Sequence, residues 1–303
     1  MIMPLKDARN YLTIAVESIL SQSFGDFELL IAEDGSTDDS LDIVKRFKDQ
    51  RIIIMSDGKS LGVAERLNQC IENSRGRYIA RMDADDISHP DRLQMQLQFL
   101  EAHKNVGICG TQFEPFDTDG NKFDLQLAVR PAECRAKLPF TTPVAHPTVM
   151  FNKKYFENAG LRYNTECAAE DYDLWVRASQ YFDISNLDSK LLNYRLHKEQ
   201  ITSKNSGAIE KSSNESRRKA LDNIKVSYSR DELDLHFAIT CYADLSGEGK
   251  ILQAKNWLSK IANNKWQTVD DKMYLRRECQ FYLDDLAQRA GADRQVLDID
   301  KFS

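Results

Sequence analysis

Two acidic clusters stand out as residues that could do chemistry, because each directly follows a short apolar run. Glu33–Asp34 follows Phe27–Ala32, and Asp83–Asp86 follows Tyr78–Met82. If the apolar runs are strands of one parallel sheet, both clusters lie at its carboxyl edge, where open α/β sheets bind their ligands. Carboxylates gathered at one edge repel one another unless a cation or hydrogen-bond donors lie between them. The sequence therefore predicts an acidic ligand site that contains a cation or such donors.

The elements that would position these clusters are short strands alternating with helices. The predicted strands are Phe27–Ala32, Arg51–Met55, Tyr78–Met82 and Val106–Gly110. Apolar side chains recur with helical spacing within residues 11–20, 41–47, 63–71 and 93–100. Such alternation is typical of an α/β fold with a mainly parallel sheet flanked by helices. Because the sequence begins almost inside its first strand, we expect that strand to form a short sheet edge.

The last third of the sequence differs from the rest. All seven prolines lie before residue 148, and beyond Gly207 the apolar residues follow helical spacing almost continuously. A polar stretch, Lys204–Gly207, separates the two parts. We therefore predict an α/β domain over residues 1–204 and a helical C-terminal region over residues 205–303. Arg217, Arg218 and Lys219 leave two interpretations open, a contact with anionic lipid or a solvated helix face.

Composition excludes several classes of protein. The 303 residues have a net charge of −6, and the excess of acidic residues lies before residue 205. We expect no nucleic-acid partner, since nucleic-acid binders present a basic face. The longest apolar runs are four residues, far short of the ~20 that a membrane span needs, and no signal peptide is recognisable. Six scattered cysteines without a CxxC pair suit a reducing cytoplasm.

A series of motifs runs along residues 1–203. In chain order they are Met3–Pro4, Ser18–Phe24, Asp26–Leu29, Glu33–Asp38, Arg81–Ser88, Pro90–Leu93, His146–Phe151, Ala169–Trp175 and Tyr194–His197. Each motif alone is a weak signal, but their order and spacing resemble the family two glycosyltransferases, which have a Rossmann-like GT-A fold. The resemblance implies a metal-dependent enzyme that moves a sugar from a nucleotide-sugar to an acceptor.

The resemblance also implies a metal site. A nucleotide-sugar carries a diphosphate whose charge a divalent cation must neutralise, and Mn²⁺ or Mg²⁺ prefers carboxylate oxygens. Asp83 and Asp85 are two residues apart, so in extended backbone they point the same way. By resemblance, Asp85 binds the metal, Asp83 holds the ribose or the metal, and His197 is a further candidate ligand. The alternative for this cluster is an acidic helix N-terminus.

Asp34 is implied to read the base of the nucleotide, and Pro4, Glu33 and Arg81 complete the implied donor site. An alternative for Asp34 is capping of the helix that follows it. The family usually has an aromatic residue and Asn where this chain has Lys6–Asp7. The lysine stem would then cover the base, or its ammonium would meet a phosphate. Uridine remains the expected base, so we expect a UDP-sugar.

Catalysis is implied for Glu170 and Asp171. Asp171 stands where inverting members have their general base, and a carboxylate beside an acceptor hydroxyl can take its proton as the oxygen attacks. Glu170 is a candidate to orient the acceptor, and the alternative for both is an acidic helix start. We expect Trp175 to be a core residue, and His146 to be either a structural or a functional histidine.

We therefore expect an inverting hexosyl- or N-acetylhexosaminyltransferase that builds a surface polysaccharide or a lipid-linked glycan. The expected location is the cytoplasm, with a peripheral contact at the inner membrane face left open. Residues 113–140 and part of the helical C-terminal region are expected to shape the acceptor site. A nucleotidyltransferase is one alternative, but it would need a Gly-rich basic phosphate loop, which Met3–Asn10 lacks. An inactive nucleotide-sugar-binding or scaffold protein is another, and the joint presence of Asp83, Asp85 and Asp171 argues against it.

Overall fold

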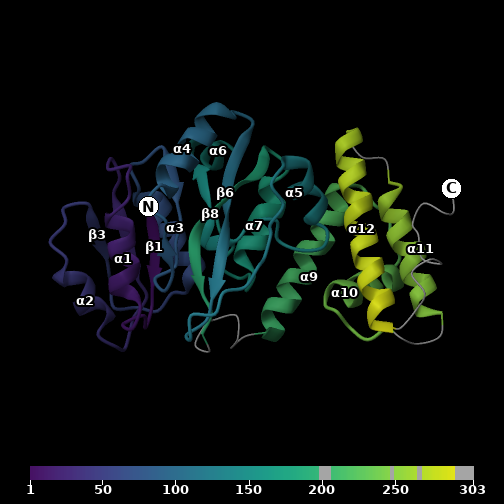
Figure 1. The fold of residues 1–303 in the computed structure, drawn as a ribbon, viewed down its shortest axis with the longest axis horizontal. Coiled ribbons are helices and arrows are strands. Elements are labelled where there is room, and N and C mark those ends of the chain that lie inside the picture. Colours follow the sequence, from purple (N-terminus) through teal and green to yellow (C-terminus); the bar gives the residue numbers. More distant parts are fainter. Residues whose placement is uncertain (198–205, 246–248, 265–267, 291–303) are drawn as a thin grey trace.

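The structure is a computed structural model that describes residues 1–197, 206–245, 249–264 and 268–290 (Figure 1). Its strands are β1 (Ile2–Leu5), β2 (Leu29–Glu33), β3 (Ile52–Met55), β4 (Tyr78–Ala80), β5 (Ile87–Ser88), β6 (Val106–Phe116), β7 (Met150–Asn152) and β8 (Asp183–Arg195). The helices before residue 180 are α1 (Leu12–Leu20), α2 (Ser40–Arg46), α3 (Val63–Asn73), α4 (Arg92–Ala102), α5 (Pro131–Lys137), the 3₁₀ turn η1 (His146–Thr148), α6 (Lys153–Asn158) and α7 (Glu170–Ala178). Those after residue 205 are α9 (Ser206–Asn223), α10 (Arg230–Thr240), α11 (Lys250–Ala262) and α12 (Val269–Ala290).

The strands form two sheets that meet at β1. The first is parallel, in the order β1-β2-β3, and the second has the order β4-β7-β6-β8-β5. In the second sheet β6 and β8 are parallel, whereas the pairs β4-β7, β6-β7 and β5-β8 are antiparallel. A parallel bridge between Ile2 and Arg81 joins the sheets. As expected, the first strand is the outer strand of its sheet, and the chain leaving β4 runs along the side of β1 that β2 does not cover.

The α/β class predicted from the sequence is confirmed, and each predicted strand is present, three of the four with shifts of at most two residues at their ends. Alternation of strands and helices did not indicate the antiparallel pairs, because β7 is only three residues long and β8 is rich in polar residues. The predicted strand Val106–Gly110 continues to Phe116, since β8 pairs with it along that length. β8 matters most for function, because it carries the motif Tyr194–His197 back toward the end of β4.

Apolar side chains from both faces hold the first sheet in place. Leu12, Val16 and Ile19 of α1 are fully buried on one side, and Leu67 and Cys70 of α3 are fully buried on the other. Full burial of such a side chain stabilises the fold by about 1.5–3 kcal/mol. The carboxyl ends of β1 and β2 are thereby fixed relative to each other. No disulfide contributes, because all six cysteines are free thiols.

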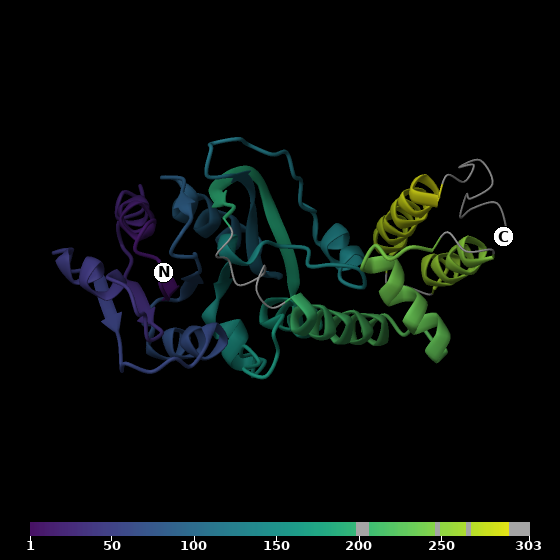
Figure 2. The ribbon, with the colours of Figure 1, turned by 90° about the horizontal axis from the view of Figure 1, so that it is seen from below.

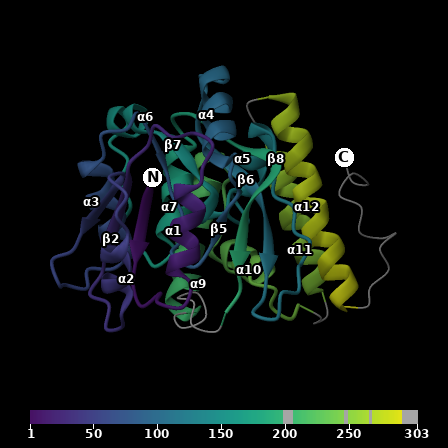
Figure 3. The same cartoon turned by 60° about the vertical axis from the view of Figure 1, so that its left-hand side comes forward.

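Helices α10–α12 lie at the opposite end of the molecule from β3 and α2, and α9 runs from α7 toward them (Figures 1 and 2). Together these four helices form a C-terminal group. They share a hydrophobic cluster with Ala132 and Ala136 of α5 and with Phe140, whose ring stacks on Tyr282 at 4.8 Å between centroids. Figure 3 shows α12 beside α5. The predicted boundary at residue 204 lies outside the described residues, so the division into two domains remains a prediction.

The basic residues considered for lipid contact have partners within the chain. Lys219 of α9 donates to the buried Asp173 of α7 at 2.8 Å. Arg217 donates to the carbonyl of Phe140 at 2.9 Å, and Arg218 pairs with two acidic residues of its own helix. These contacts fasten α9 to the α/β unit. Within the described ranges, no helix combines the length and the apolar character that crossing a membrane would require.

Candidate active site

The acidic segment after β4 gathers three carboxylates. One oxygen from each of Asp83, Asp85 and Asp86 lies within 4.8 Å of the others. A turn at Ala84–Asp85, rather than the extended backbone assumed from the sequence, brings them together. The segment then enters β5 and not a helix, so the alternative of an acidic helix N-terminus is wrong.

Asp86 is the most deeply buried of the three. Its Oδ1 accepts a hydrogen bond from the backbone N–H of Arg195 at 2.9 Å. Its Oδ2 is buried and has no hydrogen-bond partner among the described residues. Burial, and then the charges of Asp83 and Asp85, raise the pKa of Asp86 well above its ordinary value. The fold therefore holds negative charge here that its own donors do not fully compensate.

His197 reaches the same cluster from the end of β8. Its Nε2 lies 2.8 Å from Oδ2 of Asp85. β8 pairs antiparallel with β5, with Asn193 opposite Ile87, and this pairing brings the residues after β8 to the acidic segment. Asp83, Asp85 and His197, the predicted metal-binding residues, are thus neighbours. Their role as ligands remains a prediction.

Arg81 lies between the acidic segment and a second pair of acids. Its buried guanidinium forms an ion pair with Asp83, while its Nε has no hydrogen-bond partner within the described parts of the chain. Burial raises the pKa of both Glu170 and Asp171, and the positive charge of Arg81 opposes this rise in each case. Arg81 is therefore positioned to act on both acidic groups, which the sequence places almost ninety residues apart.

Glu170 and Asp171 are the first two residues of α7, so the alternative that this acidic pair begins a helix is correct as a description of the structure. A position at the start of a helix is compatible with a catalytic role. Burial, reinforced by the Asp171 charge, raises the pKa of Glu170 to about 7. Asp171 also has a raised pKa, with burial as the main cause, although its Oδ1 accepts the N–H of Tyr172 at 2.7 Å. Glu170 can therefore hold or release a proton near neutral pH, and burial makes the carboxylate of Asp171 a stronger base than an exposed aspartate, as general acid–base chemistry requires.

His146 and Trp175 form the wall behind Glu170. His146 Nε2 lies 2.9 Å from the hydroxyl of Tyr163, and Nδ1 lies 3.9 Å from Glu170 Oε1. Burial, and then the charge of Arg81, lower the pKa of His146 well below its ordinary value, so the imidazole is neutral and forms no ion pair. Trp175 is fully buried, which confirms that it is a core residue.

Asp34 lies at the carboxyl end of β2 and holds the loop that leads into α3. Its carboxylate accepts the backbone N–H groups of Leu61 at 2.6 Å and Gly62 at 3.2 Å, and the Nε of Arg66 at 3.0 Å. Burial would raise the pKa of Asp34, but these hydrogen bonds outweigh it and hold the pKa below its ordinary value. Asp34 therefore binds the start of α3, not that of the helix directly after it, as the capping alternative assumed.

The loop comes very close to the end of β2. Gly35 has a φ of +68°, and a Cβ there would lie 3.1 Å from the carbonyl carbon of Lys59, so the position suits only glycine. Lys6 Nζ lies 2.6 Å from Ser60 Oγ and 3.7 Å from Asp34 Oδ2. The lysine that replaces the family's usual aromatic residue thus lies at the rim of the predicted base site.

The other two residues of the predicted donor site have structural contacts. Glu33 is buried, and its carboxylate accepts hydrogen bonds from the Ser56 hydroxyl at 2.7 Å and from the N–H of Ser36. The bond from Ser56, which follows β3, joins the ends of β2 and β3. Pro4 lies in β1 opposite Ala32. Both stand at the carboxyl edge of the first sheet, but direct contact with a donor remains a prediction for each.

Sequence reasoning missed two residues that shape the site. Arg66 is almost completely buried and pairs with Asp34 and Asp57, yet it occurs in an ordinary helical pattern that gives no signal of this. Arg195 belongs to a motif that was recognised, but the motif gave it no role. It contacts both Asp85 and Asp86.

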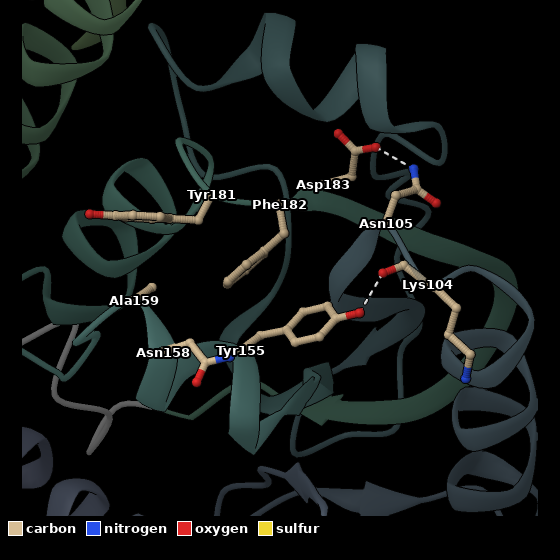
Figure 4. Close-up of a pocket in the computed structure, with 8 residues that line it drawn as sticks. All are labelled: Lys104, Asn105, Tyr155, Asn158, Ala159, Tyr181, Phe182 and Asp183. Atoms are coloured by element: carbon tan, nitrogen blue, oxygen red, sulfur yellow. Dashed lines mark hydrogen bonds between the residues drawn. The ribbon is translucent and has the colours of Figure 1, made fainter.

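A hollow of about 580 Å³ lies at the other end of the second sheet (Figure 4). Tyr155 and Phe182 line it, together with Asn105 and Asp183, which are hydrogen-bonded to each other at 2.6 Å. Asp183 begins β8, whereas the residues after its other end contact the acidic segment. The hollow is therefore separate from the candidate active site.

Comparison with known proteins gives a consistent picture. The sequence model of glycosyl transferase family 2 matches residues 1–160. The O-antigen biosynthesis glycosyltransferase WbnJ of Escherichia coli is 32% identical over 208 residues, which cover 65% of this chain and 78% of WbnJ. The chain spans between about a third and two thirds of the length of further curated glycosyltransferases that it matches.

Solved structures share the fold. Residues 1–349 of TarS of S. aureus, in complex with UDP-GlcNAc, align with a TM-score of 0.61 at 15% identity, and the match covers 96% of this chain and 91% of that TarS fragment. The mannosyltransferase PcManGT of Pyrobaculum calidifontis, in complex with GDP-Man and Mn²⁺, aligns with a TM-score of 0.56 at 14% identity and covers 95% and 85%. The expected GT-A fold is confirmed. With more than half of its length matched by the family model, the chain belongs to glycosyl transferase family 2.

Proposed function

We propose that this protein is a metal-dependent, inverting glycosyltransferase that moves a sugar from a UDP-sugar to a glycan or lipid-linked acceptor in the synthesis of a surface polysaccharide. Family membership supports sugar transfer, and the similarity to WbnJ supports a polysaccharide product. The observation that carries the proposal further is the cluster of Asp83, Asp85 and Asp86, in which Asp83 forms an ion pair with Arg81 and His197 Nε2 lies 2.8 Å from Asp85.

The acidic segment fits a divalent cation. Three carboxylate oxygens lie within 4.8 Å of one another, and the buried Oδ2 of Asp86 has no hydrogen-bond partner in the described residues. Oxygen donors of this kind suit Mg²⁺ and Mn²⁺. We assign Asp85 and Asp83 as ligands, with His197 beside them. When bound, the cation would neutralise the diphosphate and stabilise the departing nucleotide.

The remaining residues divide between the donor and the acceptor. Asp34 and Lys6 line the rim where the base of the nucleotide would lie, and Asp34 keeps its charge because its pKa is lowered. Asp171 takes the proton of the acceptor hydroxyl; burial raises the pKa of Asp171, and the positive charge of Arg81 opposes that rise. Glu170, with its pKa near 7, is protonated in part of the molecules at neutral pH and can donate a hydrogen bond to the acceptor.

A hydrolysis and transfer screen tests this proposal. The protein is incubated with UDP- and GDP-sugars in Mn²⁺, Mg²⁺ or EDTA, and release of the nucleoside diphosphate is measured. We expect metal-dependent release from at least one UDP-sugar and loss of release in EDTA. Release of pyrophosphate from a nucleoside triphosphate and a sugar phosphate would instead identify a nucleotidyltransferase. Failure to bind any of these donors would favour a scaffold role.

A further inference from the structure

We propose that Arg195 is a positioning residue that holds Asp85 and Asp86 in place for cation binding. The inference rests on the metal dependence in the proposed function. It concerns a residue that touches neither the donor nor the acceptor in that proposal. Its basis is a set of contacts that join the end of β8 to the acidic segment.

Arg195 makes two hydrogen bonds to that segment. Its backbone N–H donates to Asp86 Oδ1 at 2.9 Å, and its side-chain Nε donates to the backbone carbonyl of Asp85 at 2.9 Å. His197, two residues later, lies 2.8 Å from the Asp85 carboxylate. One short stretch of chain thus contacts the backbone of Asp85, the side chain of Asp85 and the side chain of Asp86.

Two aromatic rings fix the guanidinium of Arg195. Its central carbon lies 4.5 Å from the ring centroid of Tyr11 and 4.6 Å from that of Phe116. Cation–π contacts of this kind each contribute roughly 0.5–2 kcal/mol. Tyr11 also packs against the ring of His197, with centroids 5.0 Å apart. The side chain of Arg195, at the end of β8, is therefore where three segments meet: the residue before α1, the end of β6 and the end of β8.

This arrangement places the positive charge of Arg195 beside the acidic segment that is proposed to bind the cation. The side-chain Nε of Arg195 donates to the backbone carbonyl of Asp85, and His197 lies beside the carboxylate of Asp85. Repulsion among Asp83, Asp85 and Asp86 would otherwise push the turn apart before a cation arrives. A guanidinium can stack between two rings and donate sideways, whereas a lysine ammonium cannot reproduce that planar geometry.

Arg195→Lys tests the proposal, because it keeps the charge and removes the planar fork. Binding of Mn²⁺ to the metal-free protein is measured by electron paramagnetic resonance, without any donor sugar. Loss of a group that orients metal ligands typically lowers metal affinity 10- to 100-fold, so we expect a Kd for Mn²⁺ about 10 to 100 times that of the wild type. The signal of the bound ion should also broaden as its ligands become less regular.

Arg77→Lys is the matched control. Arg77 also lies over an aromatic ring, Tyr78 at 5.0 Å, and forms an ion pair with Glu101, but it precedes β4 and is largely exposed. Its substitution should leave Mn²⁺ affinity unchanged. If Arg195→Lys does not fold, two substitutions of Tyr11 are tested in its place. Tyr11→Leu removes one of the rings that contact Arg195 and should weaken Mn²⁺ binding. Tyr11→Phe keeps the ring and should leave Mn²⁺ binding unchanged.

The outcomes separate this proposal from the proposed function. A wild-type protein that binds no Mn²⁺ or Mg²⁺ would overturn the metal dependence and, with it, the role of Arg195. A wild-type protein that binds Mn²⁺, together with a folded Arg195→Lys variant whose Kd lies within twofold, would overturn the role of Arg195 alone. Equal weakening by Arg77→Lys would also overturn it, because the effect would then not be specific to this contact.

Discussion

Asp86 at the candidate active site and Asp271 at the base of the C-terminal helices are equally inaccessible to solvent, but their surroundings differ. Asp271 Oδ1 accepts a hydrogen bond from Nε of Arg135 at 2.8 Å and forms an ion pair with Nη2 of the same guanidinium at 2.7 Å, while Oδ2 accepts the hydroxyl of Thr268 at 2.8 Å. Asp173, nearby in the same junction, pairs with Arg177 and Lys219. Both oxygens of each junction carboxylate therefore have a cationic or hydroxyl partner.

The carboxylates after β4 are less well compensated. Asp86 has one backbone donor and one buried oxygen with no partner among the described residues, and two further carboxylates stand beside it. A buried charge without partners is costly, whereas a paired one joins the elements that supply the partners. An aspartate therefore stabilises the fold where the C-terminal helices meet the α/β unit, whereas an aspartate of the acidic segment after β4 is available to bind a ligand. Asp→Asn substitutions at the two places should have opposite consequences.

The largest expected effect is that of Asp85→Asn. An amide is a poor cation ligand, so Mn²⁺-dependent binding of UDP should be abolished, and transfer should fall by at least about 10³-fold. The free energy of unfolding should stay the same or rise, since one of three repelling charges is gone. Isothermal titration of UDP with Mn²⁺ and denaturant unfolding measure the two quantities. Metal-dependent affinity equal to that of the wild type would remove Asp85 from the metal site.

The second effect concerns Asp171→Asn, which keeps the shape of the side chain and removes its basicity. A positioned base contributes ~10²–10⁴-fold, or roughly 3–5 kcal/mol of barrier, so transfer should fall by that factor. Affinity for UDP with Mn²⁺ should hardly change, because the base acts on the acceptor. Nuclear magnetic resonance of the product should show an anomeric configuration opposite to that of the donor. A retained configuration would contradict the single displacement that assigns this role.

The third effect is a pH dependence at Glu170. Burial raises the pKa of Glu170 from 4.5 to about 7, so the folded protein binds this proton more tightly than the unfolded chain does. The free energy of unfolding should therefore fall as the pH rises from about 4.5 to 7, by up to about 3 kcal/mol. Glu170→Gln removes this contribution. Urea unfolding in EDTA at pH 5 and pH 8 should show a smaller loss for the variant, and equal losses would contradict the assignment.

The sequence predicts those parts of the molecule in which the residues of the candidate site directly follow a recognisable apolar strand or belong to a recognisable motif. The strands that precede Glu33 and Asp83 have clear apolar runs, although β2 and β4 belong to different sheets that are joined by the bridge between Ile2 of β1 and Arg81. The motif order also identified His197, although it lies more than a hundred residues from Asp85. These features depend on residue type and spacing, which are readable directly.

Other features depend on contacts between distant segments and could not be predicted. β8 has no strong alternation of polar and apolar residues. Its first part is buried, its middle is partly exposed, and it is buried again where β5 pairs with it. The Arg66–Asp34 pair and the Arg195 contacts arise only when loops close over the strand ends. A buried arginine in a helical pattern looks like an exposed one until its partner is in place.

The smallest expected effect, and the counterpart of Asp85→Asn, is that of Asp271→Asn at the junction. Hydrogen bonds to charged groups contribute about 1.5–3 kcal/mol, and the asparagine would keep the shape but lose the charge that Arg135 faces. Because Arg135 also pairs with Asp183 and is partly exposed, its charge would not be stranded. We therefore expect the free energy of unfolding to fall by about 2 kcal/mol. Affinity for UDP with Mn²⁺ should stay within twofold of the wild type, since Asp271 contacts α5 and not the acidic segment.

Asp285→Asn, at an exposed pair within α12, is the matched control and should change stability by less than about 0.5 kcal/mol. If Asp271→Asn instead weakened nucleotide binding while leaving stability unchanged, the C-terminal helices would belong to the donor site, and the contrast between the two carboxylate environments would not hold.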